Sequence, residues 1–214
     1  MPKTWALIRT CVLIVGALAA LFNGGAGQAQ AAPAAPLGDV ISIGNPDARA
    51  QVDLFVDPLC PYSGELIRQQ GPAIGRHLEA GTLHLNLRFV SFLEKRSASG
   101  TYDSRAIYAA FQVADKSQSS DVTWRFVQAL YAAANQPEEH GPTDLDNGQI
   151  ADLAAAAGAP QVAQDLIRLG LPIGFDVQAI EAENLAALDS FPESGVPMVV
   201  IGGKSVDPDS RWLG

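Results

Sequence analysis

Alternating and continuous runs of apolar residues indicate several β-strands along the chain. The clearest signal lies in residues 82–90 (TLHLNLRFV), where every second residue is apolar, as expected for a strand with one buried face. Residues 39–43 and 51–57 predict two shorter strands, the second almost continuously apolar. A Gly-Gly pair separates two short strand-like runs within residues 197–206, which predicts a β-hairpin.

Helical spacing of apolar residues fills most of the remaining chain. A helix is expected to begin at Pro61, because a missing N–H has no cost at the first helical position, and to end at Gly81. Further helices are predicted at residues 103–116, 121–134, 147–157, 160–169 and 176–189. Asp121 or Ser120 is the expected N-cap of the second of these. Strands on both sides of helices indicate an α/β domain.

The first 31 residues follow the order of a secretory signal peptide. Lys3 and Arg9 precede the apolar run 11–22, and small residues lead to an Ala-x-Ala sequence, so cleavage is expected near Ala31. The apolar run has 12 residues, fewer than the roughly 20 that a membrane-spanning helix needs. An uncleaved anchor is the alternative.

The charge of the chain argues against two classes of partner. The net charge is -9, and it is -11 after residue 31 because the preceding segment has two basic residues and no acidic one. An acidic surface disfavours binding to nucleic acid or to anionic membranes. Together with the signal-peptide pattern, this charge leads us to expect a secreted, periplasmic or cell-envelope protein without stable membrane insertion. After the signal peptide we expect a linker at 32–37 and one domain at 38–214.

Cysteine usage points to a reactive thiol. Cys11 lies in the predicted signal peptide, so the exported form would keep Cys60 alone and could form no disulfide within itself. Cys60 falls between a strand and a helix start, where free N–H groups favour an anion such as a thiolate, the nucleophile of disulfide exchange. The alternative is a small buried hydrophobic residue. The flanking Pro58 and Pro61 argue against burial.

The stretch from Ile43 to Tyr62 resembles the beginning of DsbA-like exported thiol oxidoreductases. Both have a turn, an apolar strand, an acidic residue three positions before the cysteine (here Asp57) and a Cys-Pro-aromatic sequence. The resemblance covers nearly all of residues 38–206. It implies a thioredoxin-like α/β fold with a helical insert, at about residues 97–190, between the third and fourth predicted strands.

The same resemblance implies roles for individual residues. Cys60 would be the nucleophile, and Pro61 and Tyr62 would shape the helix start and contact the substrate. Val196 and Pro197 match a pair that in the family is joined by a cis peptide bond and lines the substrate groove. Judged alone, Pro197 would equally fit a trans proline at the start of an edge strand.

Three features depart from the family pattern. Ser63 replaces the second cysteine, so a mixed disulfide on Cys60 would need an outside thiol for its release. Ser63 is predicted to support the thiolate by a hydrogen bond, unless it is simply a helix residue. Leu54 occupies the position of a buried acid that in the family helps proton transfer to the second thiol. Residues 211–214 supply at most one turn of the family's final helix.

The sequence therefore predicts an exported monothiol thiol–disulfide oxidoreductase acting on exported proteins with thiols or disulfides, or on a small thiol. Release by the substrate's own thiol would make it an isomerase, and release by a small thiol a reductase. A non-catalytic binding or chaperone-like module and an oxidant sensor are the alternatives. No cofactor or metal site is predicted, because His77, His84 and His140 lack metal-ligand spacing and are interpreted as surface residues.

Overall fold

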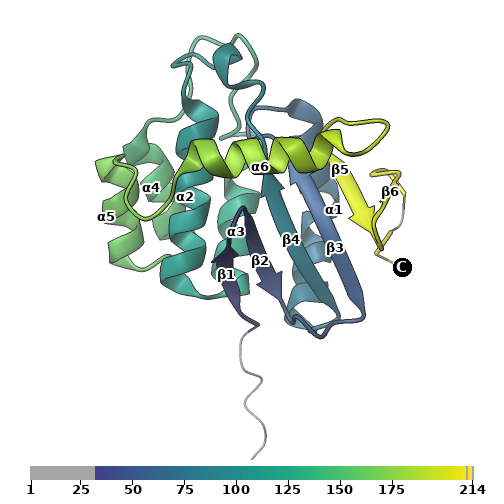
Figure 1. The fold of residues 1–214 in the computed structure, drawn as a ribbon. Helices are drawn as coiled ribbons and strands as arrows, with labels where there is room; N and C mark the ends of the chain where they lie inside the picture. The colour runs from purple at the N-terminus through teal and green to yellow at the C-terminus, as the bar shows by residue number, and fades with distance from the viewer. Residues whose placement is uncertain (1–31, 211, 214) are drawn as a thin grey trace, which may run out of the picture. The chain divides into compact units, whose positions relative to one another are not determined.

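A computed structural model describes residues 32–210 and 212–213, so the predicted signal peptide lies outside the described residues. Figure 1 shows the arrangement of the elements. In chain order they are β1 (Ala34–Leu37), β2 (Val40–Gly44), β3 (Ala50–Val56), α1 (Pro61–Glu79), β4 (Leu83–Phe89), η1 (Glu94–Arg96), α2 (Tyr102–Ser117), α3 (Ser120–Leu130), α4 (Asn147–Ala157), α5 (Gln161–Leu169), α6 (Val177–Asp189), β5 (Met198–Ile201) and β6 (Lys204–Val206).

The described strands form one mixed sheet in the order β1-β2-β4-β3-β5-β6. β3 and β4 are parallel and are joined by α1, whereas the other neighbouring strands are antiparallel. β3 pairs with β4 on one side and with β5 on the other. The loop that carries Cys60 therefore leaves the sheet from a central strand, between the segment that leads into β5 and the segment that follows β4.

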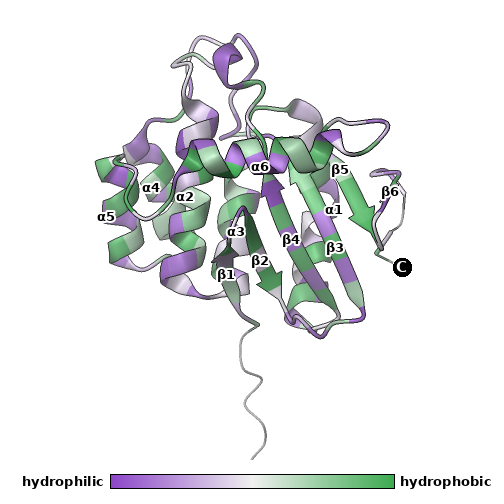
Figure 2. Ribbon diagram, in the orientation of Figure 1, coloured by the Kyte–Doolittle hydropathy of each residue, from purple (hydrophilic) through white to green (hydrophobic). Residues whose placement is uncertain are grey.

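Helices pack on both faces of the sheet. The four apolar residues of β4, from Leu83 to Phe89, are completely buried on one face, which confirms the alternating pattern. Burying each such side chain contributes about 1.5–3 kcal/mol. α1 packs against this side, and Figure 1 shows α6 crossing the opposite face. Hydrophilic bands cross β3 and β4 in Figure 2. Among the polar residues of these strands, Asn86 and Arg88 of β4 both donate hydrogen bonds to the Asp53 carboxylate of β3.

The predicted helical insert is confirmed, because α2 to α6 lie between β4 and β5 in the chain. The N-cap of α3 is Ser119, whose hydroxyl accepts the Val122 N–H, so the expectation of Asp121 or Ser120 was wrong. Ser120 instead donates its hydroxyl to the Pro33 carbonyl at 2.6 Å and accepts the Gly44 N–H at 3.0 Å. Among the described helices none is long and apolar enough to cross a membrane.

The segment expected to be a linker, residues 32–37, contains a strand. Ala34–Leu37 form β1, which pairs antiparallel with β2 at the edge of the sheet. Ala34 is only 1% exposed, so this strand also contributes to the core. An edge strand tolerates Pro36 because a missing N–H is not needed on the unpaired side. The Pro and Ala residues, which are poor strand formers, hid this strand from pattern analysis.

Candidate active site

Cys60 is the N-cap residue of α1 and the last residue of the four-residue loop between β3 and α1. No side chain caps the helix there, and Pro61 occupies one of its first positions, as predicted. The backbone N–H groups of the first turn therefore point toward the region of the thiol, where a negative charge is favoured. Cys60 is a free cysteine. It is only 5% exposed, so the expectation that the flanking prolines keep it from burial was wrong.

The burial of Cys60 comes from the segment before β5. The Cys60 thiol donates a hydrogen bond to the backbone carbonyl of Val196, with 3.6 Å between Sγ and O. The peptide bond between Val196 and Pro197 is cis, as the resemblance implied. Residues 136 positions apart are thus brought together because β3 and β5 are neighbours in the sheet. Whether Val196 and Pro197 bind substrate stays a prediction.

Two aromatic side chains are exposed, one directly after the cysteine loop and one in the loop after β4 that Asp57 contacts. Tyr62, two residues after Cys60, is 68% exposed, and Phe92, three residues beyond the end of β4, is 51% exposed. Exposed aromatic rings are enriched where proteins contact other proteins. The position of Tyr62 fits the predicted substrate contact, and Phe92 is an exposed aromatic residue that the sequence analysis did not single out.

Ser63 is completely buried in the first turn of α1. Its hydroxyl oxygen accepts the backbone N–H of Asp57 at 3.3 Å, so it fastens the start of the cysteine loop to the helix. An accepted hydrogen bond leaves the hydroxyl hydrogen available for donation. The predicted hydrogen bond from Ser63 to a Cys60 thiolate therefore stays a prediction, while a structural role in the loop is observed.

Asp57 fixes the cysteine loop to a second loop. Its carboxylate accepts the N–H of Leu59 at 2.9 Å through Oδ1 and the N–H of Leu93 at 3.1 Å through Oδ2. Its backbone carbonyl accepts the N–H of Cys60 at 3.1 Å. One completely buried residue thus holds both the loop before α1 and the loop after β4. The sequence analysis noted Asp57 only as part of the family pattern.

A second completely buried carboxyl group, that of Asp103 in the first turn of α2, lies close enough to Asp57 for each to affect the pKa of the other, and neither Asp103 oxygen has another hydrogen-bond partner among the described residues. Burial raises the pKa of Asp57 to about 6, against the opposing effect of its backbone N–H partners. Burial, followed by the charge of Asp57, raises the pKa of Asp103 to about 9. Two carboxyl groups that share a site titrate as one unit, and this pair holds one proton near neutral pH. Pattern analysis does not reveal this pair, because an Asp in a first helical turn is also typical of exposed helices.

Gln136, from the segment after α3, holds the cysteine loop from the side of the helical insert. Its Nε2 donates to the carbonyl oxygens of Pro58 at 3.1 Å and Cys60 at 2.9 Å. Its Oε1 accepts a hydrogen bond from Arg68 at 2.9 Å. This side chain passes so close to α1 that a Cβ atom on Gly64 would lie 1.9 Å from Oε1. Glycine at this position therefore makes room for the contact, which pattern analysis could not reveal.

The remaining candidates are not part of this arrangement. Leu54 is completely buried in the apolar core, so the position of the family's buried acid is apolar here. His84 is 9% exposed and hydrogen-bonds to Ser42 and Gln51, so its interpretation as a surface residue was wrong. Burial lowers the pKa of His84. His84 lies in β4, and its hydrogen-bond partners Ser42 and Gln51 lie in the neighbouring strands β2 and β3.

Comparison with known proteins supports the fold and the class of chemistry. No family model matches the chain. The chain is 29% identical over 178 residues to the serine/threonine-protein kinase PknE of Mycobacterium tuberculosis, a match that covers 83% of this chain and 31% of the kinase. The chain thus spans about a third of the length of the curated relatives it matches.

The similar solved structures are thiol–disulfide oxidoreductases. MdbA, a thiol-disulfide oxidoreductase from Corynebacterium matruchotii, aligns with a TM-score of 0.72 at 22% identity over 86% of this chain and 90% of its own. Reduced DsbG from Mycobacterium tuberculosis aligns with a TM-score of 0.66 at 27% identity, covering 81% and 82%. Oxidised DsbA from the same organism gives 0.62 at 27% identity, covering 82% and 85%.

The chain therefore has the thioredoxin-like fold of DsbA-type proteins, as the resemblance implied. Its similarity to these structures supports a general role in thiol–disulfide chemistry. In this chain a free cysteine at a helix start lies against a cis Val-Pro bond, and Ser63 and Leu54 are both completely buried.

Proposed function

We propose that this protein is an exported thiol–disulfide oxidoreductase that works through one cysteine, Cys60. The observation that carries the proposal is the placement of the Cys60 thiol at the start of α1, 3.6 Å from the Val196 carbonyl. The Val196–Pro197 segment offers a backbone edge beside the thiol for an extended substrate chain. Tyr62 and Pro61 flank the thiol on the helix side.

The first chemical step joins Cys60 to the substrate. The Cys60 thiolate attacks one sulfur of a substrate disulfide, an S–S bond forms to Cys60, and the substrate S–S bond breaks. The second substrate sulfur leaves as a thiolate and takes a proton from water. No electrons are gained or lost overall, because one disulfide replaces another. With Ser63 in place of a second cysteine, no thiol of this site can resolve the product.

The second step needs a thiol from outside the site, and its identity decides the outcome. If a thiolate of the same substrate attacks the substrate sulfur of the mixed disulfide, a rearranged substrate disulfide forms and Cys60 is released as a thiolate, which is isomerisation. If a small thiol attacks the Cys60 sulfur, the substrate leaves reduced. A second small thiol then frees Cys60, and two small thiols have become one small disulfide, which is net reduction.

The partners that fit this chemistry are exported proteins with exposed thiols or disulfides, or a small thiol of the same compartment. Export rests on the signal-peptide pattern of residues 1–31. What favours exchange over a non-catalytic binding module is the similarity to structures named as thiol–disulfide oxidoreductases, together with a free thiol at the helix start.

Reactivation of ribonuclease with scrambled disulfides tests the proposal. The reduced mature protein is expected to restore ribonuclease activity with only trace thiol present, and Cys60→Ser is expected to restore none. Adding a small thiol should increase turnover by resolving trapped mixed disulfides. Equal reactivation by the two proteins would refute monothiol exchange and leave the non-catalytic module as the better description.

A further inference from the structure

We propose that Asp57 and Asp103 share a single proton and that this proton holds the Cys60 loop in the position needed for disulfide exchange. The two residues act as positioning residues, since Asp57 binds the loop backbone and Asp103 acts through Asp57. The proposal rests on the proposed exchange at Cys60, and it concerns groups that the exchange steps themselves do not use.

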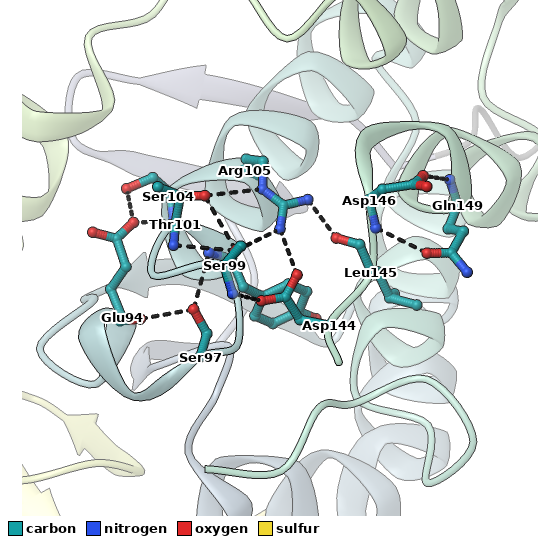
Figure 3. Close-up of polar contacts among 11 residues, drawn as sticks. Glu94, Ser97, Ser99, Thr101, Ser104, Arg105, Asp144, Leu145, Asp146 and Gln149 are labelled. Atoms are coloured by element: carbon teal, nitrogen blue, oxygen red, sulfur yellow. Dashed lines mark hydrogen bonds and ion pairs between the residues drawn. The ribbon is translucent and has the colours of Figure 1, made fainter. Parts of the chain in front are cut away.

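Among the described residues, no basic side chain forms an ion pair with Asp57 or Asp103. Both residues are completely buried, and neither carboxyl oxygen of Asp103 has a hydrogen-bond donor in the part of the chain that the structure describes. Arg105, two residues along α2, is directed elsewhere. Figure 3 shows its guanidinium paired with Asp144, at 2.8 Å, and bonded to the Leu145 carbonyl. Two buried carboxylates in contact would repel strongly, so one proton stays between them.

Titratable and charged side chains of the neighbouring elements also surround the pair. Glu94 of η1 and Glu181 of α6 act on Asp103, and Tyr102 of α2 and Tyr131 at the end of α3 are affected by both aspartates. Farther out, Arg105 of α2 and Asp144 of the following loop act on Tyr102, and Lys95 of η1 acts on Glu181. The carboxylates among them favour retention of the proton, and the basic side chains are paired with acids, Lys95 with Glu94 at 3.6 Å and Arg105 with Asp144. Burial raises the pKa of both tyrosines, so neither supplies a charge.

Hydrogen bonds of the Asp57 carboxylate connect the shared proton with the loop that carries the thiol. The same Asp57 carboxylate that shares the proton also accepts the N–H groups of Leu59 and Leu93. Leu59 precedes Cys60 directly, so the direction of the loop depends on this carboxylate staying in place. When the proton leaves, repulsion between the two carboxylates displaces Asp57 or Asp103. The loop then loses hydrogen bonds, and the thiol loses its fixed position beside Val196.

Three variants separate this role from simple stability. Asp103→Asn keeps a permanent donor to Asp57 and removes the titrating proton. Asp103→Leu removes the hydrogen bond at every pH. Asp115→Asn, on the partly exposed part of the same helix, is the matched control for loss of one charge. The measured quantity is the rate at which Cys60 forms a mixed disulfide with a small aromatic disulfide, from pH 7 to pH 10.

The ratio of the Asp103→Asn rate to the wild-type rate is expected to rise about tenfold over this range. The reason is that, one pH unit above the pKa at which the pair loses its shared proton, only about one pair in ten retains that proton. Taking the ratio removes the common change in Cys60 thiolate content. Asp115→Asn should give a constant ratio, and Asp103→Leu should be slow throughout. A constant ratio for Asp103→Asn would overturn the proposal.

A second readout does not depend on exchange at all. Amide hydrogen-exchange protection of Leu59 and Leu93, corrected for the intrinsic pH effect, is expected to fall about tenfold above the same pH in the wild type and to persist in Asp103→Asn. If this occurs and Cys60 forms no mixed disulfide at any pH, the proposed exchange fails while the proton-dependent loop is retained. If mixed disulfides form but protection of these amides does not change with pH, the positioning role is refuted.

Discussion

The proton shared by Asp57 and Asp103 should make the free energy of unfolding depend on pH, by an amount that follows from the pKa values of the pair. In the unfolded chain both Asp57 and Asp103 titrate near 3.9, so neither holds a proton above pH 6. In the folded protein the pair, with pKa values of about 6 and about 9, holds one proton from about pH 6 to about pH 9. The folded state therefore binds one more proton than the unfolded state. Stability is highest at the low-pH side of this window and is lost as pH rises.

The expected slope follows from linkage. One excess proton in the folded state lowers the free energy of unfolding by about 1.4 kcal/mol per pH unit. Between pH 7.0 and pH 8.5 the loss is about 2 kcal/mol, a large part of the 5–15 kcal/mol typical of a domain. Urea unfolding followed by circular dichroism measures it as a fall in the transition midpoint at constant slope m.

Two other groups with shifted pKa values, His84 and Glu181, also affect the pH dependence of stability and determine the choice of controls. Burial lowers the pKa of His84 from 6.5, so its effect has the opposite sign and ends as the unfolded histidine loses its proton, below the chosen window. Burial raises the pKa of Glu181, which acts with the same sign as the pair. Asp103→Asn is expected to abolish the slope, and Glu181→Gln to retain most of it. A wild-type free energy of unfolding that stays flat from pH 7.0 to pH 8.5 would refute the shared proton.

The remaining predictions concern the loop, the thiol pair and a helix start. Gln136→Ala removes the two hydrogen bonds to the carbonyls of Pro58 and Cys60, so urea unfolding should show a loss of about 1–2 kcal/mol, and an unchanged midpoint would contradict that contact. Ser63→Cys restores a resolving thiol, so intact mass after oxidation should show an internal disulfide, two mass units lighter. Persistence of a mixed disulfide in this variant would contradict the geometry. Ser119→Ala removes the N-cap of α3 and should cost about 1 kcal/mol by the same unfolding assay, with no loss arguing against this cap.

Elements with strong periodicity could be predicted from the sequence. The alternation in residues 82–90 and the proline at position 61 have local physical meaning, so β4 and the start of α1 were found within two residues. β1 was missed because its Pro and Ala residues carry no pattern, and only pairing with β2 makes it a strand. Ser119 caps α3 in place of Ser120 because the Ser120 hydroxyl is bonded to the segment before β1 and to the end of β2, which are tertiary contacts.

The candidate site was predictable only in part. The single cysteine and its resemblance to a known active-site pattern located Cys60 and pointed to the Val196–Pro197 segment. The groups that hold the loop come from elsewhere in the chain, Asp103 from α2 and Gln136 from the loop after α3. Nothing in the types or spacing of these residues marks them, because their role arises from burial and from contacts between elements distant in sequence.

Intact-mass analysis of mixed-disulfide formation tests the central claim most directly. The folded, reduced mature protein is incubated with a peptide disulfide, and then with a small thiol, with Cys60→Ser treated in parallel. The account predicts one adduct of the peptide on the wild type, stable until the small thiol is added, and none on the variant. No adduct on the folded wild type, with an adduct on the same chain in denaturant, would contradict the claim that Cys60 is a working nucleophile.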